Sequence, residues 1–333
     1  MAVRVGINGF GRVGRSYLRS ALEREIEVVA INDLTSTSCL AHLLKYDSTY
    51  GPLGRAVDQD EGSISVDGRV IEVYSHPDPA GLPWEELGVD VVIESTGRFR
   101  AREDAATHLK AGARKVLISA PGKGVDLTVV VGVNEQDYDP AIHDVVSTAS
   151  CTTNCVVPMV KVLHDAFGIA KGFMTTIHGY TNDQLLLDGP HKDLHRARSA
   201  AVNLIPTSTG AARSVGLVIP ELTGRIDGVA VRVPVEDGSL TDLTVILDRA
   251  VTRDQVNAVF AGASDAGPLA RVLEYTTDPI VSRDVVGNAA SCVFDAGLTQ
   301  VNEDFVKVFG WYDNEWGYAN RLADFTEYVG RRL

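Results

Sequence analysis

The chain has 333 residues, a formal net charge of −13 and 45% hydrophobic residues. This length allows two domains, each with its own core, and no apolar run approaches the roughly 18 residues that a membrane-spanning helix needs. The negative charge disfavours general nucleic-acid binding, and a start without signal-peptide character together with only four cysteines predicts a cytoplasmic protein with reduced thiols.

The first third of the chain alternates between strand and helix patterns. Strand patterns occupy residues 3–8, 27–32, 89–95 and 115–119, and helical patterns occupy residues 11–21, 40–44 and 101–112. Such alternation is typical of an α/β fold, in which a doubly wound parallel sheet carries helices on both faces. We expect a Rossmann-type domain over residues 1–150.

A glycine-rich turn follows the first strand pattern. Gly9, Gly11 and Gly14 fit the G-x-G-x-x-G signature and open a helix, which lets a pyrophosphate approach the backbone. Asp33 ends the second strand pattern, where a carboxylate accepts hydrogen bonds from ribose hydroxyls and repels a 2′-phosphate. These residues predict an NAD site, against the alternative of a glycine turn in a domain that binds no dinucleotide.

Cys151 stands where a helix is predicted to begin. A β-like run at 144–147 precedes it, and residues 156–167 are apolar at helical spacing up to Gly168. Backbone N–H groups and the macrodipole at a helix N-terminus favour an anion, so the thiolate form of Cys151 is expected to be stabilised. We predict a nucleophile here, although free cysteines are often buried small hydrophobic residues.

His178 ends a strand pattern over residues 173–178, where catalytic groups often project. An imidazole beside Cys151 can keep the thiolate form and can serve as general base. A satisfied core histidine is the alternative. A metal site made of Cys151, Cys155 and His178 is disfavoured, because no further pair of ligands completes a tetrahedral set.

Residues suited to anions come later in the chain. Residues 207–212 resemble a hydroxyl-rich turn that enters a helix, and Arg196, Arg198 and Arg232 offer guanidinium groups that fit phosphate. Arg232 lies in an otherwise apolar strand pattern, so we expect it to face a polar site. Each arginine taken alone could instead be solvated or part of an ion pair.

The second half of the chain has a different pattern. Residues 228–234 and 240–247 are long β patterns joined by residues 235–239, which suggests an antiparallel hairpin. Another strand is expected at 305–313 and a helix at 315–332. We therefore expect an α+β catalytic domain with a mostly antiparallel sheet over residues 151–315.

The chain resembles the phosphorylating glyceraldehyde-3-phosphate dehydrogenases. The resemblance covers essentially all 333 residues and rests on the segments GINGFGR at 6–12, SCTTNC at 150–155, PHKD at 190–193, TGAA at 209–212 and WYDNEWGY at 311–318. It implies a homotetramer, without nucleic-acid, membrane or metal partners, that acts in glycolysis. The implied reaction oxidises D-glyceraldehyde 3-phosphate with NAD and inorganic phosphate to 1,3-bisphosphoglycerate through a Cys151 thioester, with His178 taking up the proton.

The resemblance also implies roles for further residues. The attacking phosphate is implied to bind at Ser150, Thr152, Thr209 and Gly210, and the substrate phosphate at Thr181, Arg196 and Arg232. Cofactor contacts are implied for the backbone of Arg12 and Val13, for Thr96 and Ser119, and for Asn314, which would orient the nicotinamide carboxamide. The loop at 181–208 is implied to pack against a neighbouring subunit's cofactor, and the helix at 316–333 to return to the first domain.

Several positions depart from the usual pattern of this family. Pro77 stands where a basic residue often approaches the adenosine end of the cofactor, so that contact is expected to be lost. Gly189 replaces a common leucine in the loop that helps exclude NADP, so exclusion of NADP is expected to be looser than Asp33 alone suggests. The other departures are Gly122, Gly179, Leu185 and His195. They raise the hypothesis of an inhibitor-tolerant duplicate isozyme with the same activity.

Two other functions compete with this interpretation. Erythrose-4-phosphate dehydrogenase shares the scaffold, but water instead of phosphate releases its product. A non-catalytic, NAD-sensing interaction protein is disfavoured because the chain retains Cys151, His178, Arg196 and Arg232 together.

Overall fold

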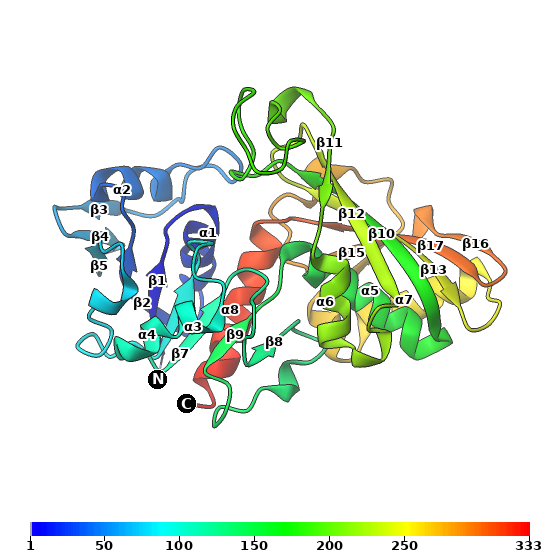
Figure 1. The fold of residues 1–333 in the computed structure, drawn as a ribbon, viewed down its shortest axis with the longest axis horizontal. Coiled ribbons are helices and arrows are strands. Elements are labelled where there is room, and N and C mark those ends of the chain that lie inside the picture. The colour runs from blue at the N-terminus through cyan, green and yellow to red at the C-terminus, as the bar shows by residue number, and fades with distance from the viewer. Residues whose placement is uncertain (1) are drawn as a thin grey trace. The chain divides into compact units, whose positions relative to one another are not determined.

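The computed structural model describes residues 2–333 and divides into two compact units, each described by itself (Figure 1). The first unit contains the chain up to Val129, together with Glu135–Ala149 and Ala319–Leu333. The second contains Val130–Asn134 and Ser150–Tyr318.

The first unit is built on a sheet with the order β3-β4-β5-β2-β1-β6-β7-β9-β8. From β5 to β8 all neighbours are parallel, and only β3, β4 and β5 pair antiparallel at one edge. The strands are β1 (Val3–Asn8), β2 (Ile26–Asn32), β3 (Val57–Gln59), β4 (Ser63–Val66), β5 (Arg69–Tyr74), β6 (Val91–Glu94), β7 (Lys115–Ile118), β8 (Leu127–Thr128) and β9 (Val145–Ser147). The expected Rossmann-type parallel sheet is confirmed.

Helices of this unit flank the sheet. They are α1 (Arg12–Ala21), α2 (Thr37–Lys45), α3 (Arg102–Ala105), α4 (Thr107–Lys110) and α8 (Trp316–Gly330), of which the last continues from the second unit. The single helix expected at 101–112 is therefore two short ones. The returning part of α8 packs on α1, where the Tyr17 hydroxyl lies 3.1 Å from the Thr326 hydroxyl and Ser20 donates to Asn320.

The second unit is built on a mostly antiparallel sheet with the order β11-β12-β10-β13-β17-β15-β14, and β16 pairs with β17. Only β10–β12 and β14–β15 are parallel pairs. The strands are β10 (Ile169–Gly179), β11 (Ile205–Ser208), β12 (Ile226–Val233), β13 (Ser239–Leu247), β14 (Leu273–Thr276), β15 (Cys292–Asp295), β16 (Gln300–Asn302) and β17 (Phe305–Tyr312). This confirms the second half of the fold prediction.

Helices α5 (Cys151–Phe167), α6 (Ala211–Val218) and α7 (Arg253–Asp265) pack on one face of this sheet (Figure 1). The opposite face is less covered, and Phe173 on β10 is 72% exposed. Short 3₁₀ helices complete the chain: η1 (Pro79–Gly81), η2 (Glu135–Asp137), η3 (Ala200–Val202), η4 (Pro220–Leu222), η5 (Pro268–Arg271), η6 (Ser282–Val285) and η7 (Ala296–Leu298).

The predicted hairpin of residues 228–234 and 240–247 is wrong. Both segments are strands, β12 and β13, but β10 lies between them and pairs with each. The connection at 235–239 therefore crosses over β10. Periodicity indicates where a strand lies, but its neighbours in the sheet are decided by non-local packing.

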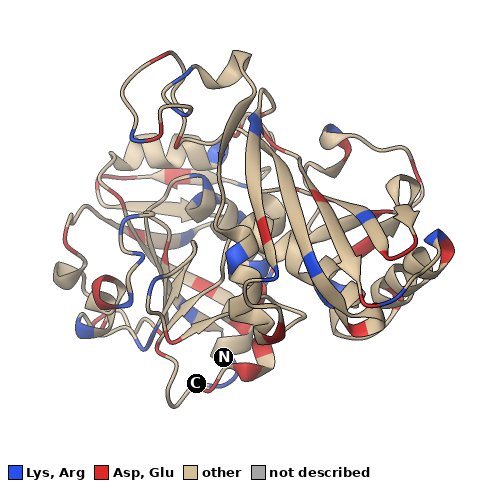
Figure 2. Cartoon of the chain, turned by 45° about the vertical axis from the view of Figure 1, so that its right-hand side comes forward, with Lys and Arg blue, Asp and Glu red and all other residues tan. Residues whose placement is uncertain are grey.

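Charges of both signs are distributed along both units (Figure 2). Among residues 2–333, none of the helices has the length and apolar character needed to cross a membrane.

Candidate active site

The glycine turn after β1 forms the floor of a pocket in the first unit. Gly9 has a φ of +93°, and a Cβ added there would lie 2.7 Å from the backbone nitrogen of Thr96. A Cβ at Gly14 would lie 2.3 Å from the carbonyl oxygen of Gly9, so this glycine lets α1 pack closely on the turn. A Cβ at Gly11 would meet no atom within 4 Å, which leaves open space at the N-terminus of α1 for an anionic group.

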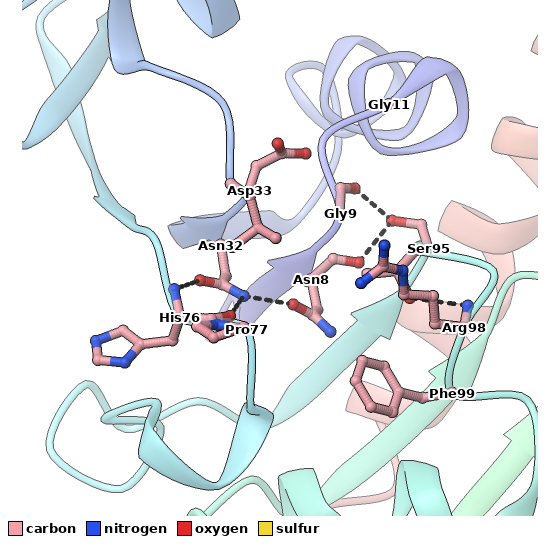
Figure 3. Close-up of a pocket in the computed structure, with 12 residues that line it drawn as sticks. Asn8, Gly9, Gly11, Asn32, Asp33, His76, Pro77, Ser95, Arg98 and Phe99 are labelled. Carbon is pink, nitrogen blue, oxygen red and sulfur yellow. Dashed lines mark hydrogen bonds between the residues drawn. The ribbon is translucent and has the colours of Figure 1, made fainter.

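Four predicted cofactor residues line this pocket: Gly9, Gly11, Asp33 and Thr96 (Figure 3). Pro77 lines it as well. The other predicted cofactor residues of this unit, Arg12, Val13, Gly14 and Ser119, lie outside the lining, and the Arg12 guanidinium pairs with Asp47. The Arg12 side chain is therefore engaged by a carboxylate of its own unit.

Asp33 connects the glycine turn to the end of β2. Its carboxylate accepts a hydrogen bond from the Phe10 N–H at 2.8 Å and another from the Thr35 N–H at 3.0 Å, one on each oxygen. A carboxylate oxygen can accept two hydrogen bonds, so both oxygens keep a lone pair for ribose hydroxyls. The site therefore fits the adenosine ribose of a dinucleotide.

Sequence reasoning missed seven residues of the lining: Asn8, Asn32, Leu34, His76, Ser95, Arg98 and Phe99. Asn8 ends β1 and Asn32 ends β2, while Ser95 follows β6 directly. Ligands of open α/β sheets bind at the carboxyl ends of the strands, so the last polar residue of each strand pattern was a usable signal.

In the second unit, Cys151 is the first residue of α5. The side chain of Ser150 caps this helix by accepting a hydrogen bond from the Thr153 N–H at 3.1 Å. Ala149, just before the cap, has a φ of +58°, a conformation that costs a residue with a side chain about 1–2 kcal/mol. The chain thus turns sharply immediately before the thiol.

The register of β10 against β12 brings a catalytic candidate and a predicted phosphate-binding residue together. His178 lies directly opposite Arg232, so both side chains leave the sheet on the same face. The Nε2 atom of His178 lies 3.4 Å from the Sγ atom of Cys151. The sequence motifs at residues 151, 178 and 232 therefore meet at the N-terminus of α5.

The contacts of His178 determine its tautomer. Its Nδ1 lies 2.7 Å from the carbonyl oxygen of Gly179, which can only accept, and 3.0 Å from Nη1 of Arg232, which can only donate. The shorter of the two contacts is with the carbonyl oxygen, which favours the tautomer with the proton on Nδ1. The Nη1 atom of Arg232 also donates a hydrogen bond to the Gly179 carbonyl oxygen, at 3.1 Å. The Nε2 atom is then left with its lone pair facing the thiol, the arrangement that a general base needs.

Burial favours the neutral forms of both Cys151 and His178. It raises the pKa of the Cys151 thiol to about 11, while the Arg232 guanidinium opposes the rise. Burial and the Arg232 charge lower the pKa of His178 to about 3. The expected preference for the thiolate is thus outweighed in the ligand-free chain, and the imidazole is a neutral base at pH 7.

The predicted phosphate residues fall into separate groups. Arg232 reaches the Thr181 hydroxyl at 3.4 Å, and its buried Nε has no hydrogen-bond partner within residues 2–333. Arg196 instead pairs with Asp183 and donates to the Thr207 hydroxyl at 2.9 Å. Within residues 2–333 Arg232 has no carboxylate partner, so its charge is available to an incoming anion.

The other four predicted phosphate residues lie near helix starts. The Thr152 hydroxyl is within 2.9 Å of the Tyr312 hydroxyl, and Ser150 is the cap of α5. Thr209 accepts from the Ala211 N–H at 3.2 Å, and Gly210 precedes α6, so the expected turn into a helix is confirmed.

Asn314 is buried and held from two sides. Its side-chain oxygen accepts a hydrogen bond from the Ser239 hydroxyl at 2.5 Å, and its backbone N–H donates to the Asp237 carboxylate at 3.2 Å. The side-chain amide nitrogen (Nδ2) of Asn314 is then the group that can donate to a ligand. Cys155, by contrast, directs its thiol to the carbonyl oxygen of Gly310 at 3.6 Å and not toward His178, which removes the geometric basis for a shared metal site.

The two units match two parts of one family. Residues 3–102 match the NAD binding domain of glyceraldehyde 3-phosphate dehydrogenase, and residues 150–314 match its C-terminal domain. The glyceraldehyde-3-phosphate dehydrogenase of Streptomyces coelicolor is 59% identical over 336 residues, covering all of both chains. The chain belongs to the glyceraldehyde-3-phosphate dehydrogenase family. Relatives from Geobacillus stearothermophilus and Bacillus subtilis, the latter named glyceraldehyde-3-phosphate dehydrogenase 1, are each 54% identical over 334 residues, covering all of this chain and 99% of theirs.

Membership of this family confirms the predicted resemblance and makes NAD the cofactor of this chain. The open space beside Gly11 and the unused lone pairs of Asp33 fit the pyrophosphate and ribose of that cofactor.

Two departures from the glyceraldehyde-3-phosphate dehydrogenase pattern are connected in space. A Cβ added at Gly189 would lie 3.1 Å from the Cδ1 atom of Leu185, so the leucine at 185 occupies the room that a side chain at 189 would need. Gly122 is similarly matched to Val125, whose Cγ1 would be 2.4 Å from an added Cβ. At Gly179 an added Cβ would lie 3.0 Å from the Val235 carbonyl oxygen, whereas His195 is exposed.

Proposed function

We propose that this chain catalyses the NAD-dependent oxidation of D-glyceraldehyde 3-phosphate to 1,3-bisphosphoglycerate, with inorganic phosphate as the acyl acceptor. The observation that carries the proposal is the approach of His178 Nε2 to the Cys151 thiol, with Arg232 beside both. The named relatives are glyceraldehyde-3-phosphate dehydrogenases, which does not favour the erythrose 4-phosphate alternative.

The first step follows from the neutral state of the pair. As the Cys151 sulfur bonds to the aldehyde carbon, Nε2 of His178 takes the thiol proton and passes it to the aldehyde oxygen, which gives a hemithioacetal. His178 then removes the hydroxyl proton while a hydride leaves the same carbon. NAD, when bound, accepts that hydride, and a thioester on Cys151 remains.

Release of the acyl group completes the cycle. An oxygen of inorganic phosphate attacks the thioester carbonyl, the carbon–sulfur bond breaks, and the sulfur leaves as thiolate and is reprotonated. In this proposal Ser150, Thr152, Thr209 and Gly210 hold the attacking phosphate, and Thr181, Arg196 and Arg232 hold the phosphate of the substrate. Asn314 binds the nicotinamide carboxamide, and Arg12, Val13, Gly14 and Ser119 contribute to the cofactor site.

The direct test is NADH formation, followed by its absorbance, with glyceraldehyde 3-phosphate in the presence and absence of phosphate or arsenate. Phosphate-dependent turnover with NAD is the expected result. A single stoichiometric burst without turnover would contradict phosphate as the acceptor, and erythrose 4-phosphate would then be tried. The same assay with NADP measures how strictly Asp33 excludes it despite Gly189.

Asp183 is expected to weaken substrate binding by occupying Arg196. Replacing Asp183 by asparagine removes one of the two carboxylates that pair with this guanidinium and leaves Asp193, 3.6 Å from its Nε, so the KM for glyceraldehyde 3-phosphate should fall about threefold. Initial rates over a range of substrate concentrations measure this. Asp188→Asn is the matched control, because within residues 2–333 Asp188 pairs only with the exposed Arg198 side chain and the Ser199 N–H. An unchanged or higher KM in Asp183→Asn would mean that the ion pair orients Arg196 for binding.

The proposal includes a homotetramer in the cytoplasm, acting in glycolysis without nucleic-acid or membrane partners. The sheet face opposite α5 supports self-association, because Phe173 on β10 and Val229 on β12 are exposed apolar residues on neighbouring strands of that face. The loop at 181–208 adds the exposed leucines Leu186, Leu187 and Leu194. All four cysteines are free thiols, as a reducing compartment requires.

A charge on this sheet face is expected to break the assembly. Phe173→Asp should convert the tetramer to smaller species, with little loss of subunit stability because the side chain is already exposed. Light scattering after size-exclusion chromatography gives the mass. Ile142→Asp alters another exposed apolar residue, in the other unit, and should leave the mass unchanged. A tetramer that survives Phe173→Asp would place the interface elsewhere.

A further inference from the structure

A buried carboxyl group lies at the end of β6, beside the NAD pocket. Glu94 is 1% exposed, and four donors converge on it. One oxygen is contacted by the Thr96 N–H at 2.9 Å and the Thr96 hydroxyl at 2.5 Å. The other is contacted by the Asn8 amide at 2.6 Å and by His108 Nε2 at 3.1 Å. Two of these partners, Asn8 and Thr96, line the NAD pocket.

A hydrogen bond from Trp84 fixes which atom donates in the contact between His108 and Glu94. The indole N–H of Trp84 lies 3.0 Å from His108 Nδ1, and an indole nitrogen can only donate. His108 Nδ1 is therefore an acceptor, which puts the ring proton on Nε2, pointing at Glu94. Both rings are fully buried, so this orientation cannot be exchanged for a contact with water.

The same chain of hydrogen bonds continues to the adenosine side of the pocket. The Asn8 side-chain oxygen accepts from Asn32 at 2.7 Å, and Asn32 makes a reciprocal pair with the backbone of His76, at 2.8 and 2.9 Å (Figure 3). Asn32 directly precedes Asp33, and His76 directly precedes Pro77, which also lines the pocket. One continuous network thus joins the carboxyl ends of β1, β2 and β6 and the segment after β5.

We propose that Glu94 is a positioning residue for NAD. It is the common acceptor that fixes Thr96 and Asn8 directly, and Asn32 and the pocket wall at His76 through Asn8. Buried polar groups of this kind act through geometry, because each donor can be satisfied in only one arrangement. Glu94 itself does not line the pocket, so its effect on the cofactor passes through the residues that do.

Glu94→Gln tests this inference with almost no change in shape. The amide replaces one acceptor oxygen by an N–H₂ group, so either the two Thr96 donors or the Asn8 and His108 donors lose their acceptor. We expect the Kd for NAD to rise about tenfold, because buried unsatisfied donors relax by moving the residues that carry them. Calorimetric titration with NAD, without any aldehyde, measures binding separately from the proposed reaction. Alkylation of Cys151 by iodoacetamide without NAD should keep its rate.

Asp126→Asn is the control for a purely structural effect. Asp126 lies in the same unit and also receives four hydrogen bonds, from two nitrogens of Arg102 and from the N–H groups of Asp144 and Val145, but it does not connect to the pocket. The Asp126→Asn substitution should lower the midpoint temperature of thermal unfolding and leave the Kd for NAD unchanged. A Glu94→Gln protein that binds NAD within twofold of the parent, or a control that weakens binding equally, would overturn the proposal.

Trp84→Phe provides a second route if Glu94→Gln does not fold. It removes the donor that fixes the His108 tautomer, together with part of a fully buried aromatic ring, so the imidazole can turn a lone pair toward Glu94. We expect about a threefold rise in the Kd for NAD, since a single buried hydrogen bond is lost. A folded Trp84→Phe protein with unchanged NAD affinity contradicts the proposed role.

Discussion

Replacing Cys151 by serine is expected to lower kcat for aldehyde oxidation by roughly 10⁴-fold, the scale of losing a covalent nucleophile. The serine hydroxyl fits the same place at the start of α5, but it is a far weaker nucleophile and its ester is a poorer acyl donor to phosphate than a thioester. Stopped-flow absorbance of NADH separates the first turnover from the steady state, and both should be lost. NAD titration should be little affected, since serine keeps the place of the thiol and no residue that lines the glycine-turn pocket is changed.

Cys155→Ser is the matched control for this change. It makes the same atomic exchange four residues further along α5, where the thiol contacts a backbone carbonyl instead of His178. It should keep kcat within about threefold, because serine can make that contact too. If Cys151→Ser retained a tenth of the parental rate, the thiol could not be the nucleophile.

Replacing Arg232 by glutamine is expected to lower kcat/KM for glyceraldehyde 3-phosphate by about 10³-fold, through two effects of the lost charge. The buried guanidinium, whose Nε has no partner within residues 2–333, no longer meets the substrate phosphate. The pKa of Cys151 also rises further, since Arg232 opposes the effect of burial on that thiol. The thiolate fraction at a fixed pH below this pKa must then fall.

Thiol alkylation measures the second effect without substrate. The rate of Cys151 alkylation against pH should shift to higher pH in Arg232→Gln, and Arg232→Lys should restore the profile in part, because lysine keeps the charge but loses the planar fork. Arg198→Gln, at an exposed arginine whose ion pair is with Asp188, should change neither measurement. An unshifted profile in Arg232→Gln would mean that Arg232 does not act on the thiol.

Local patterns predicted most of the elements that carry the site. The strand at 3–8, the glycine turn and the helix that begins at Cys151 are where the sequence placed them, because backbone conformation and capping there depend on neighbouring residues. The helix α7 was missed although Thr252 and Gln255 form a capping box, a signal that the sequence contained.

Other parts of the site could not be read from the sequence. The place of β10 between β12 and β13 depends on pairing between residues more than fifty positions apart, such as His178 and Arg232. The network around Glu94 gathers Asn8, His108 and Trp84 from separate segments of the chain, and neither His108 nor Trp84 belongs to a motif. The neutral state of Cys151 and His178 follows from burial, which a helix-start signal does not reveal.

The shortest contact of His178 Nδ1 is with the carbonyl oxygen of Gly179, an atom of the main chain, and this contact favours the tautomer that a general base needs. No substitution at position 179 removes that oxygen, so the orientation of the base is protected from point mutation in a way that a carboxylate side chain in the same role would not be. Residues around His178 can therefore be substituted while the proton stays on Nδ1, as long as the backbone of β10 keeps the same conformation. Comparisons of side chains alone would overlook this partner, since it has no residue identity to conserve.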